Sequence, residues 1–166
     1  MVQFADVLHF SALRQKKLIS ELSGLHIVLI SKKAHIDLYP DIQNICKFTF
    51  ASDFENLSDI HRFKKIDAIC LDHNSLGEEA LIFLKRRSYQ KSLSSIPVIM
   101  ITENFEASLE DFANEGCIQD YYVGSLSNPL FNLRFKNFIQ LHCLRKEELK
   151  NDSDDPFDLA FMAYYD

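Results

Sequence analysis

Short apolar runs alternate with longer amphipathic segments along most of the chain. The clearest run, at 26–30, is continuous and rich in β-branched residues, which indicates a strand buried on both faces. Further strands are predicted at 47–51, 66–71, 96–102 and 118–123. Apolar positions at helical spacing between them predict helices at 34–45, 54–64, 76–92, 105–115 and 128–148. Strands that alternate with helices in this way predict a parallel sheet with helices on both faces.

Another amphipathic segment precedes the first strand and ends at Ser23 and Gly24. Its apolar positions repeat at about 3.6 residues and are Val7, Phe10, Leu13, Leu18 and Leu22. We therefore divide the chain into an N-terminal helix at 1–24, one α/β domain at 25–148 and an acidic linker at 149–166. The apolar face of the N-terminal helix needs a partner, either its own domain or a second copy.

Composition and charge exclude several classes of function. The 166 residues carry a net charge of -6, and five acids without a base fall at 151–166, so the remainder is nearly neutral. A near-neutral body without a basic stripe argues against nucleic acid as a partner. No apolar run is long enough to span a membrane and no signal peptide is evident, so we expect a cytoplasmic protein.

The cysteines, histidines and glycines do not form a recognised motif. Four cysteines lack C-x-x-C spacing and are expected to be reduced, structural thiols: Cys46, Cys70, Cys117 and Cys143. The six histidines lack the spacing of a zinc site. Four glycines cannot form a P-loop or a dinucleotide-binding fingerprint. A small α/β enzyme that uses the strand-end cleft is the least favoured class, because no catalytic constellation accompanies the fold.

Ligands of parallel α/β sheets gather beyond the carboxyl ends of the strands, which selects residues 31–33, 72–74, 102–104 and 124–128. Ile69-Cys70-Leu71-Asp72 ends one strand and is followed by Gly77, and Pro97 to Thr102 forms the next. With Gly116 before Asp120-Tyr121-Tyr122, this order resembles the receiver domain of two-component response regulators over about residues 25–145. The resemblance implies a flavodoxin-like (βα)5 fold, here with an extra N-terminal helix.

By that resemblance Asp72 occupies the phosphoacceptor position and Thr102 the position of the switch hydroxyl. Tyr121 or Tyr122 takes the place of the switch aromatic residue. From the residues alone, the less favoured alternative for Asp72 is a cap of the following helix, and for Thr102 it is a structural role at a strand end. For His73, a solvent-facing position at the strand end is favoured over a role as a general base.

Two functional elements of receivers are missing. Receivers place an acidic pair after the first strand to hold Mg²⁺, whereas this chain has Ser31-Lys32-Lys33. They also place a lysine after the fifth strand, and no lysine lies between Lys91 and Lys136. We hypothesise that Lys32 supplies a fixed counter-charge to Asp72, although a solvated Lys32-Lys33 pair is the simpler alternative. No metal or other cofactor is then expected.

The C-terminal segment from Pro156 to Asp166 is similar to the short helix that leads into diguanylate cyclase (GGDEF) domains. A flexible tail is the alternative. No GGDEF catalytic residues are present, so we predict a non-enzymatic, receiver-like module that regulates an output domain or partner by homodimerisation or docking. The alternative function is a working receiver that a histidine kinase phosphorylates on Asp72, with Mg²⁺ bound.

Overall fold

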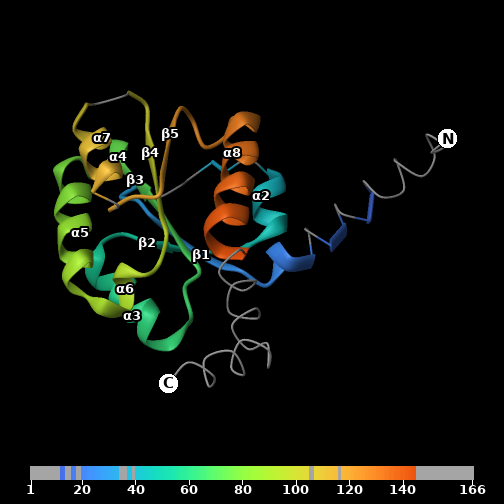
Figure 1. Cartoon of the computed structure of the whole chain (residues 1–166), viewed down its shortest axis with the longest axis horizontal. Helices are drawn as coiled ribbons and strands as arrows, with labels where there is room; N and C mark the ends of the chain where they lie inside the picture. Colours follow the sequence, from blue (N-terminus) through green and yellow to red (C-terminus); the bar gives the residue numbers. More distant parts are fainter. Residues whose placement is uncertain are drawn as a thin grey trace, which may run out of the picture.

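A five-stranded parallel sheet forms the centre of the molecule (Figure 1). The computed structural model describes residues 12, 13, 16, 17, 20–33, 37, 38, 40–104, 107–115 and 117–144. The strands are β1 (His26–Ile30), β2 (Lys47–Ala51), β3 (Ala68–Asp72), β4 (Val98–Thr102) and β5 (Asp120–Val123). They lie in the order β2-β1-β3-β4-β5. The predicted fold class is confirmed.

The last three strands each begin two residues later than predicted. Ile66, Ile96 and Ile118 are buried, but they lie in the loops that lead into the strands. An apolar run marks burial and not strand pairing, which explains the early predicted starts. β3 also extends one residue further, because Asp72 lies in register with Ile101 of β4.

The helices differ from the predicted ones mainly where special backbone geometry interrupts them. They are α2 (Pro40–Ile45), α3 (Phe54–Phe63), α4 (His73–Leu76), α5 (Glu78–Tyr89), α6 (Lys91–Ser94), α7 (Ala107–Asn114) and α8 (Pro129–Ile139). The single helix predicted at 76–92 is divided by Gly77, whose φ of 56° suits glycine, and by Gln90, which is extended. α8 continues as a π-helical turn, η1 (Gln140–Leu144).

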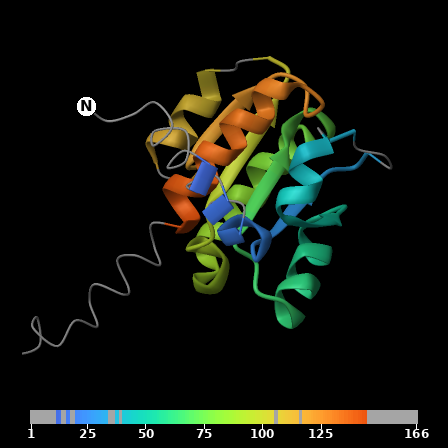
Figure 2. The ribbon, with the colours of Figure 1, turned by 90° about the vertical axis from the view of Figure 1, so that its right-hand side faces the viewer.

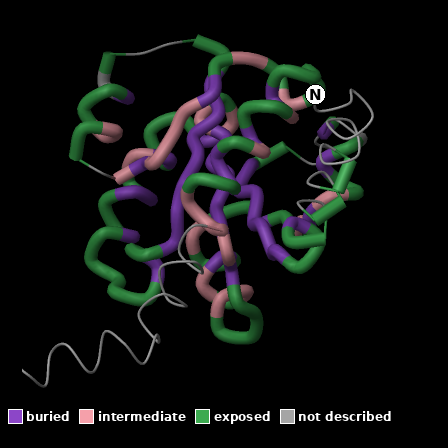
Figure 3. Tube along the Cα trace, turned by 45° about the vertical axis from the view of Figure 1, so that its right-hand side comes forward, coloured by how far each residue is buried: buried purple, intermediate pink, exposed green. Residues whose placement is uncertain are grey.

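Two helical layers enclose the sheet (Figures 1 and 2). α3 to α7 pack on one face and α2 and α8 on the other, where Phe131, Phe135 and Phe138 of α8 are almost fully buried. Figure 3 shows buried strands at the centre and exposed outer helix surfaces. Within the described part of the chain, no helix is long and apolar enough to cross a membrane.

The described end of the predicted N-terminal helix, residues 20–23, is helical and packs on the α2 and α8 face. Leu22 is 1% exposed there, whereas Leu13 is 50% exposed. The domain itself therefore covers the C-terminal end of this apolar face. Val7, Phe10 and Leu18 of that helix lie outside the described residues, as does the linker at 149–166.

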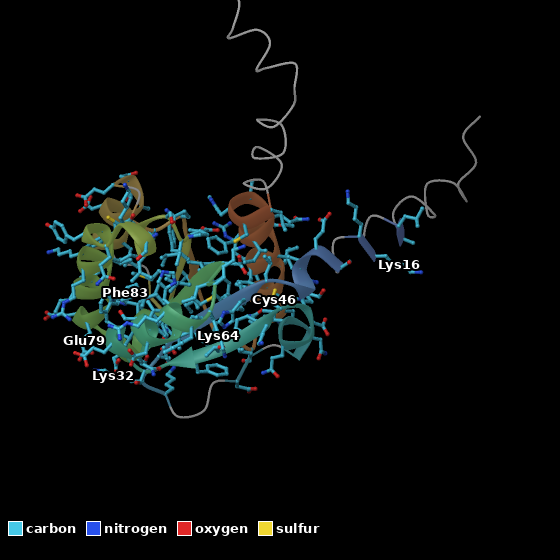
Figure 4. The ribbon with its side chains drawn as sticks, turned by 90° about the horizontal axis from the view of Figure 1, so that it is seen from below. Lys16, Lys32, Cys46, Lys64, Glu79 and Phe83 are labelled. Atoms are coloured by element: carbon cyan, nitrogen blue, oxygen red, sulfur yellow. The ribbon has the colours of Figure 1, made fainter. Side chains whose placement is uncertain are left out.

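All four cysteines are free thiols. Burial, aided by the charge of Asp67, raises the pKa of Cys46 to about 12, and burial also raises the pKa of Cys70. Figure 4 shows Cys46 beside the helices of the α2 and α8 face. Thiols held neutral in this way behave as small apolar side chains and not as nucleophiles.

We expect Cys46 to resist alkylation in the folded protein. At pH 8.5 its thiolate fraction is about 1,000-fold below that of an unperturbed cysteine with a pKa of about 8.5. Iodoacetamide labelling followed by peptide mass spectrometry measures the rate, with protein unfolded in guanidinium as the reference. A rate within tenfold of the unfolded reference contradicts the prediction.

Candidate functional site at the carboxyl ends of the strands

A pocket of about 200 Å³ opens at the carboxyl ends of β1, β3, β4 and β5. Its lining residues are Lys33, Asp37, Asp72, Asn74, Ile101, Glu103, Gly124, Ser125 and Leu126. All four segments that the strand-end rule selects from the sequence contribute to it. The parallel register brings them together, because every strand ends at the same edge of the sheet.

Asp72 lies at the floor of this pocket and is 2% exposed. It is the last residue of β3 and also the N-cap of α4, because its Oδ1 accepts a bond of 3.4 Å from the backbone N–H of Ser75. Its Oδ2 accepts a bond of 2.7 Å from the Ser31 hydroxyl. Asp72 therefore caps α4 and lines the strand-end pocket at the same time.

Ser31 and Ser75 form a hydroxyl pair beside the carboxylate, with their Oγ atoms 2.9 Å apart. The backbone N–H of Lys32 donates to Ser75 Oγ and that of Lys33 to Ser31 Oγ, both at 3.1 Å. These bonds fasten the chain after β1 to the start of α4. Neutral hydroxyls and backbone amides thus surround Asp72 on the β1 side, the side on which receivers carry acids.

Lys32 does not pair with Asp72, and the predicted counter-charge is therefore wrong. Its ammonium pairs with the carboxylate of Glu79 in the first turn of α5, and both side chains are about half exposed. Figure 4 shows Lys32 and Glu79 next to each other at the edge of the molecule. The acidic first turn of α5 draws Lys32 out of the pocket, and its neighbour Lys33 lines the pocket instead.

Thr102 ends β4 and is 1% exposed. Its hydroxyl donates to the carbonyl of Asn104 at 2.7 Å, which closes the turn after the strand. The backbone N–H of Glu103 donates to Asn74 Oδ1 at 2.7 Å, and this bond ties the end of β4 to α4. The role of Thr102 as a switch hydroxyl stays a prediction.

The two tyrosines of β5 point to opposite sides of the sheet. The Tyr122 ring packs on Phe131 at 5.1 Å between centroids, and burial raises the pKa of its hydroxyl. Tyr121 is half-buried and packs against the α3 to α7 layer. Their opposite orientation follows from the alternation of side chains along a strand. Which of them acts as a switch residue stays a prediction.

The pocket residues do not fit the Mg²⁺ site of a receiver. Magnesium prefers carboxylate and other oxygen ligands in near-octahedral geometry. Here Ser31 already occupies one oxygen of Asp72, and Lys33 adds a positive charge. Asp37 and Glu103 line the pocket, yet among the described residues no three His, Cys, Asp or Glu side chains converge as a metal site would require.

Sequence reasoning missed the roles of Ser31, Ser75, Asn74 and Glu103. Ser31, Asn74 and Glu103 carry a usable signal, because all three fall within the strand-end segments selected above. Ser75 carries a weaker signal. It lies three positions after Asp72, and an N-cap side chain commonly accepts a hydrogen bond from the backbone N–H at that position.

The chain resembles solved receiver domains in its fold. Chemotaxis response regulator CheY4 of Vibrio cholerae matches with 14% identity and a TM-score of 0.53, over 68% of this chain and 98% of that one. The receiver domain of the TMAO respiratory response regulator TorR matches with 18% identity and a TM-score of 0.56, over 72% and 99%. No protein-family model and no curated protein matches the sequence.

A structure described as adenylate cyclase from Rhodopirellula baltica matches with 12% identity and a TM-score of 0.64, over 78% of this chain and 98% of that one. At these identities the likeness concerns the fold. The chain has the fold of response-regulator receiver domains.

Proposed function

We propose that this chain is a receiver-like signalling module that acts by contact and not by phosphorylation of Asp72. The observation that carries the proposal is the hydrogen bond of 2.7 Å from Ser31 to Oδ2 of Asp72. Ser31 stands where receivers carry a metal-holding acid, and its neutral hydroxyl donates to one of the two carboxylate oxygens that could attack a phosphoryl group. The buried carboxylate then has a structural role between β1, β3 and α4.

The charges around the pocket support the same proposal. Its lining carries three carboxylates, from Asp37, Asp72 and Glu103, and one ammonium, from Lys33. A phosphoryl group would add a charge of about -2 to this set. Phosphoryl transfer needs cations that neutralise the oxygens of the transferred group. The loop after β5 offers Gly124, Ser125 and Leu126 to the pocket, none of which is charged.

A module of this kind would regulate an output domain or partner through homodimerisation or docking, without catalysis of its own. The described fold leaves large apolar side chains exposed, among them Leu130 and Leu133, which suits a protein that binds another surface. The likeness in fold to a structure described as an adenylate cyclase supports a nucleotide cyclase as the class of output domain. Among nucleotide cyclases, the C-terminal sequence from Pro156 to Asp166 favours a diguanylate cyclase as the output domain.

The alternative is a working receiver that a histidine kinase phosphorylates on Asp72. One observation favours it: Asp72 lines an open pocket that also holds the carboxylates of Asp37 and Glu103. Rotation of the Ser31 hydroxyl away from Asp72 would free Oδ2 for this chemistry.

Incubation with acetyl phosphate and Mg²⁺ distinguishes the two functions. We expect no phosphoryl adduct in the intact mass of the full chain, under conditions in which a standard receiver is modified. The physical reason is that three carboxylates face a single ammonium in the pocket lining, and that no group of three or more His, Cys, Asp or Glu among the described residues could hold Mg²⁺ there. An adduct that disappears in Asp72→Asn would overturn the proposal in favour of the working receiver.

A further inference from the structure

A groove of about 360 Å³ runs between the edge strand β5 and helix α8. Its lining residues are Tyr121, Tyr122, Val123, Leu130, Leu133, Arg134 and Asn137. Leu130 and Leu133 are 59% and 58% exposed, so they leave much apolar surface uncovered. This volume is at the lower end of the range for ligand sites, about 300–1,000 Å³, and suits a few apolar side chains.

A mainly apolar stripe continues from the groove along α8 and into η1. Leu130, Leu133, Asn137 and Leu141 recur at helical spacing, and Leu141 is 49% exposed. Arg134 lies on the same stripe, half exposed, and donates one bond of 2.7 Å to Asp120. A guanidinium has five N–H donors, so this bond leaves Arg134 able to bind another carboxylate. α8 contains two basic residues and no acid.

The C-terminal segment of this chain has the complementary chemistry. Residues 151–166 contain five acids and no base. Residues 156–166 combine two of those acids, Asp158 and Asp166, with large apolar side chains. These side chains are Phe157, Leu159, Phe161, Met162, Tyr164 and Tyr165. An acidic, aromatic-rich segment suits a groove with exposed leucines and an arginine.

The chain is long enough to bring this segment back to the groove. From Leu130 to Leu144 the helical axis covers about 21 Å at 1.5 Å per residue. The 13 residues from Leu144 to Phe157 span up to about 43 Å when extended. A linker of this length gives the segment that it carries an effective concentration on the order of millimolar. The segment of the same molecule therefore competes well against a second copy at micromolar concentration.

We infer that residues 156–166 bind in the β5–α8 groove of the same molecule. The apolar side chains cover the exposed leucines, and an acid pairs with Arg134. The groove is then closed to an external partner until the segment is released. This inference concerns regulation of the groove and does not depend on whether Asp72 accepts phosphate.

Hydrogen–deuterium exchange of the full chain tests the inference. We expect the amides of 157–166 to exchange at least about tenfold more slowly than in a free peptide of that sequence. Leu133→Glu places a charge in the groove and should return the exchange to within about twofold of the peptide. Phe161→Asp, which changes the segment and not the groove, should have the same effect.

Ile82→Glu is the matched control. Ile82 is 49% exposed on α5, on the other face of the sheet, so this variant should keep the slow exchange. Unchanged exchange of Val98–Thr102 shows that each variant is folded. Fast exchange of 157–166 in the unmodified chain overturns the inference, as does slow exchange that survives Leu133→Glu. Slowing that grows over an about hundredfold rise in protein concentration also overturns it, since the occupant is then a second copy.

Discussion

Replacement of Arg87 by leucine is expected to destabilise the domain by about 2–4 kcal/mol, because it removes the donor of one buried and two partly buried carbonyl groups. Arg87 lies on α5 and is 3% exposed. Its guanidinium donates to the carbonyls of Cys117 and Ser94, each at 3.0 Å, and to that of Ile96. Burial lowers its pKa from the ordinary value.

The three acceptors belong to different parts of the fold. Ser94 ends α6, Ile96 precedes β4, and Cys117 lies between α7 and β5. One planar guanidinium therefore fixes the entry of two strands into the sheet. An unsatisfied buried acceptor such as the Ile96 carbonyl costs about 1–3 kcal/mol. The two partly buried carbonyls cost less, because water reaches them, and the apolar surface of the new leucine offsets part of the sum.

Arg86→Leu is the matched control, because Arg86 is the exposed neighbour on the same helix. We expect it to change the free energy of unfolding by no more than about 0.5 kcal/mol. Urea denaturation of the two variants measures the difference. A loss below about 1 kcal/mol for Arg87→Leu, with folding still two-state, would show that water satisfies the three carbonyls.

The sequence predicts the sheet well and side-chain partners poorly, and Arg87 shows why. The three central strands appear as apolar runs because each is buried on both faces, so they could be placed without knowledge of their neighbours. The edge strands β2 and β5 are only partly buried, and their runs are correspondingly weaker. An arginine in the last turn of a helix is usually solvated, and its sequence neighbourhood resembles that of Arg86. Only the approach of α6 and the β5 entry loop, which is a tertiary effect, buries one arginine and leaves the other exposed.

For the candidate site too, the backbone arrangement could be predicted from the sequence and the side-chain partners could not. Strand order and parallel register make the pocket predictable, since strand ends must meet at one edge. The direction of Lys32 was not predictable, because it depends on Glu79, which lies 47 residues further along the chain. The sequence shows an absent acidic pair after the first strand. It does not show that Ser31 has taken the place of those acids as a hydrogen-bond donor to Asp72.

The double substitution Ser31→Asp and Lys32→Asp should create a Mg²⁺ site beside Asp72. Ser31 Oγ lies 2.7 Å from Asp72 Oδ2, so a carboxylate at this position comes close enough to share a cation with Asp72. We expect Mg²⁺ to bind at least about tenfold more tightly than to the unmodified chain. Without Mg²⁺ the variant should be less stable, because the new carboxylate faces Asp72 where a donor was.

Thermal unfolding at increasing Mg²⁺ concentration measures this gain, since a ligand of the native state raises the melting temperature by mass action. The matched control, Ser31→Asn with Lys32→Asn, also removes the pair with Glu79 but adds no charge. It should show no magnesium-dependent shift. The broken surface pair itself is worth only about 0–1 kcal/mol.

A magnesium-dependent shift in the acidic variant alone would place the difference from a working receiver at residues 31 and 32. The pocket, Asp72 and the backbone would then be competent, and the chain would have lost metal binding through two side chains. Equal behaviour of the acidic and amide variants contradicts the prediction. In that case the bond from the backbone amide of residue 32 to Ser75, which both variants keep, holds this loop in a geometry that a metal cannot use, and the departure from receivers lies in the backbone.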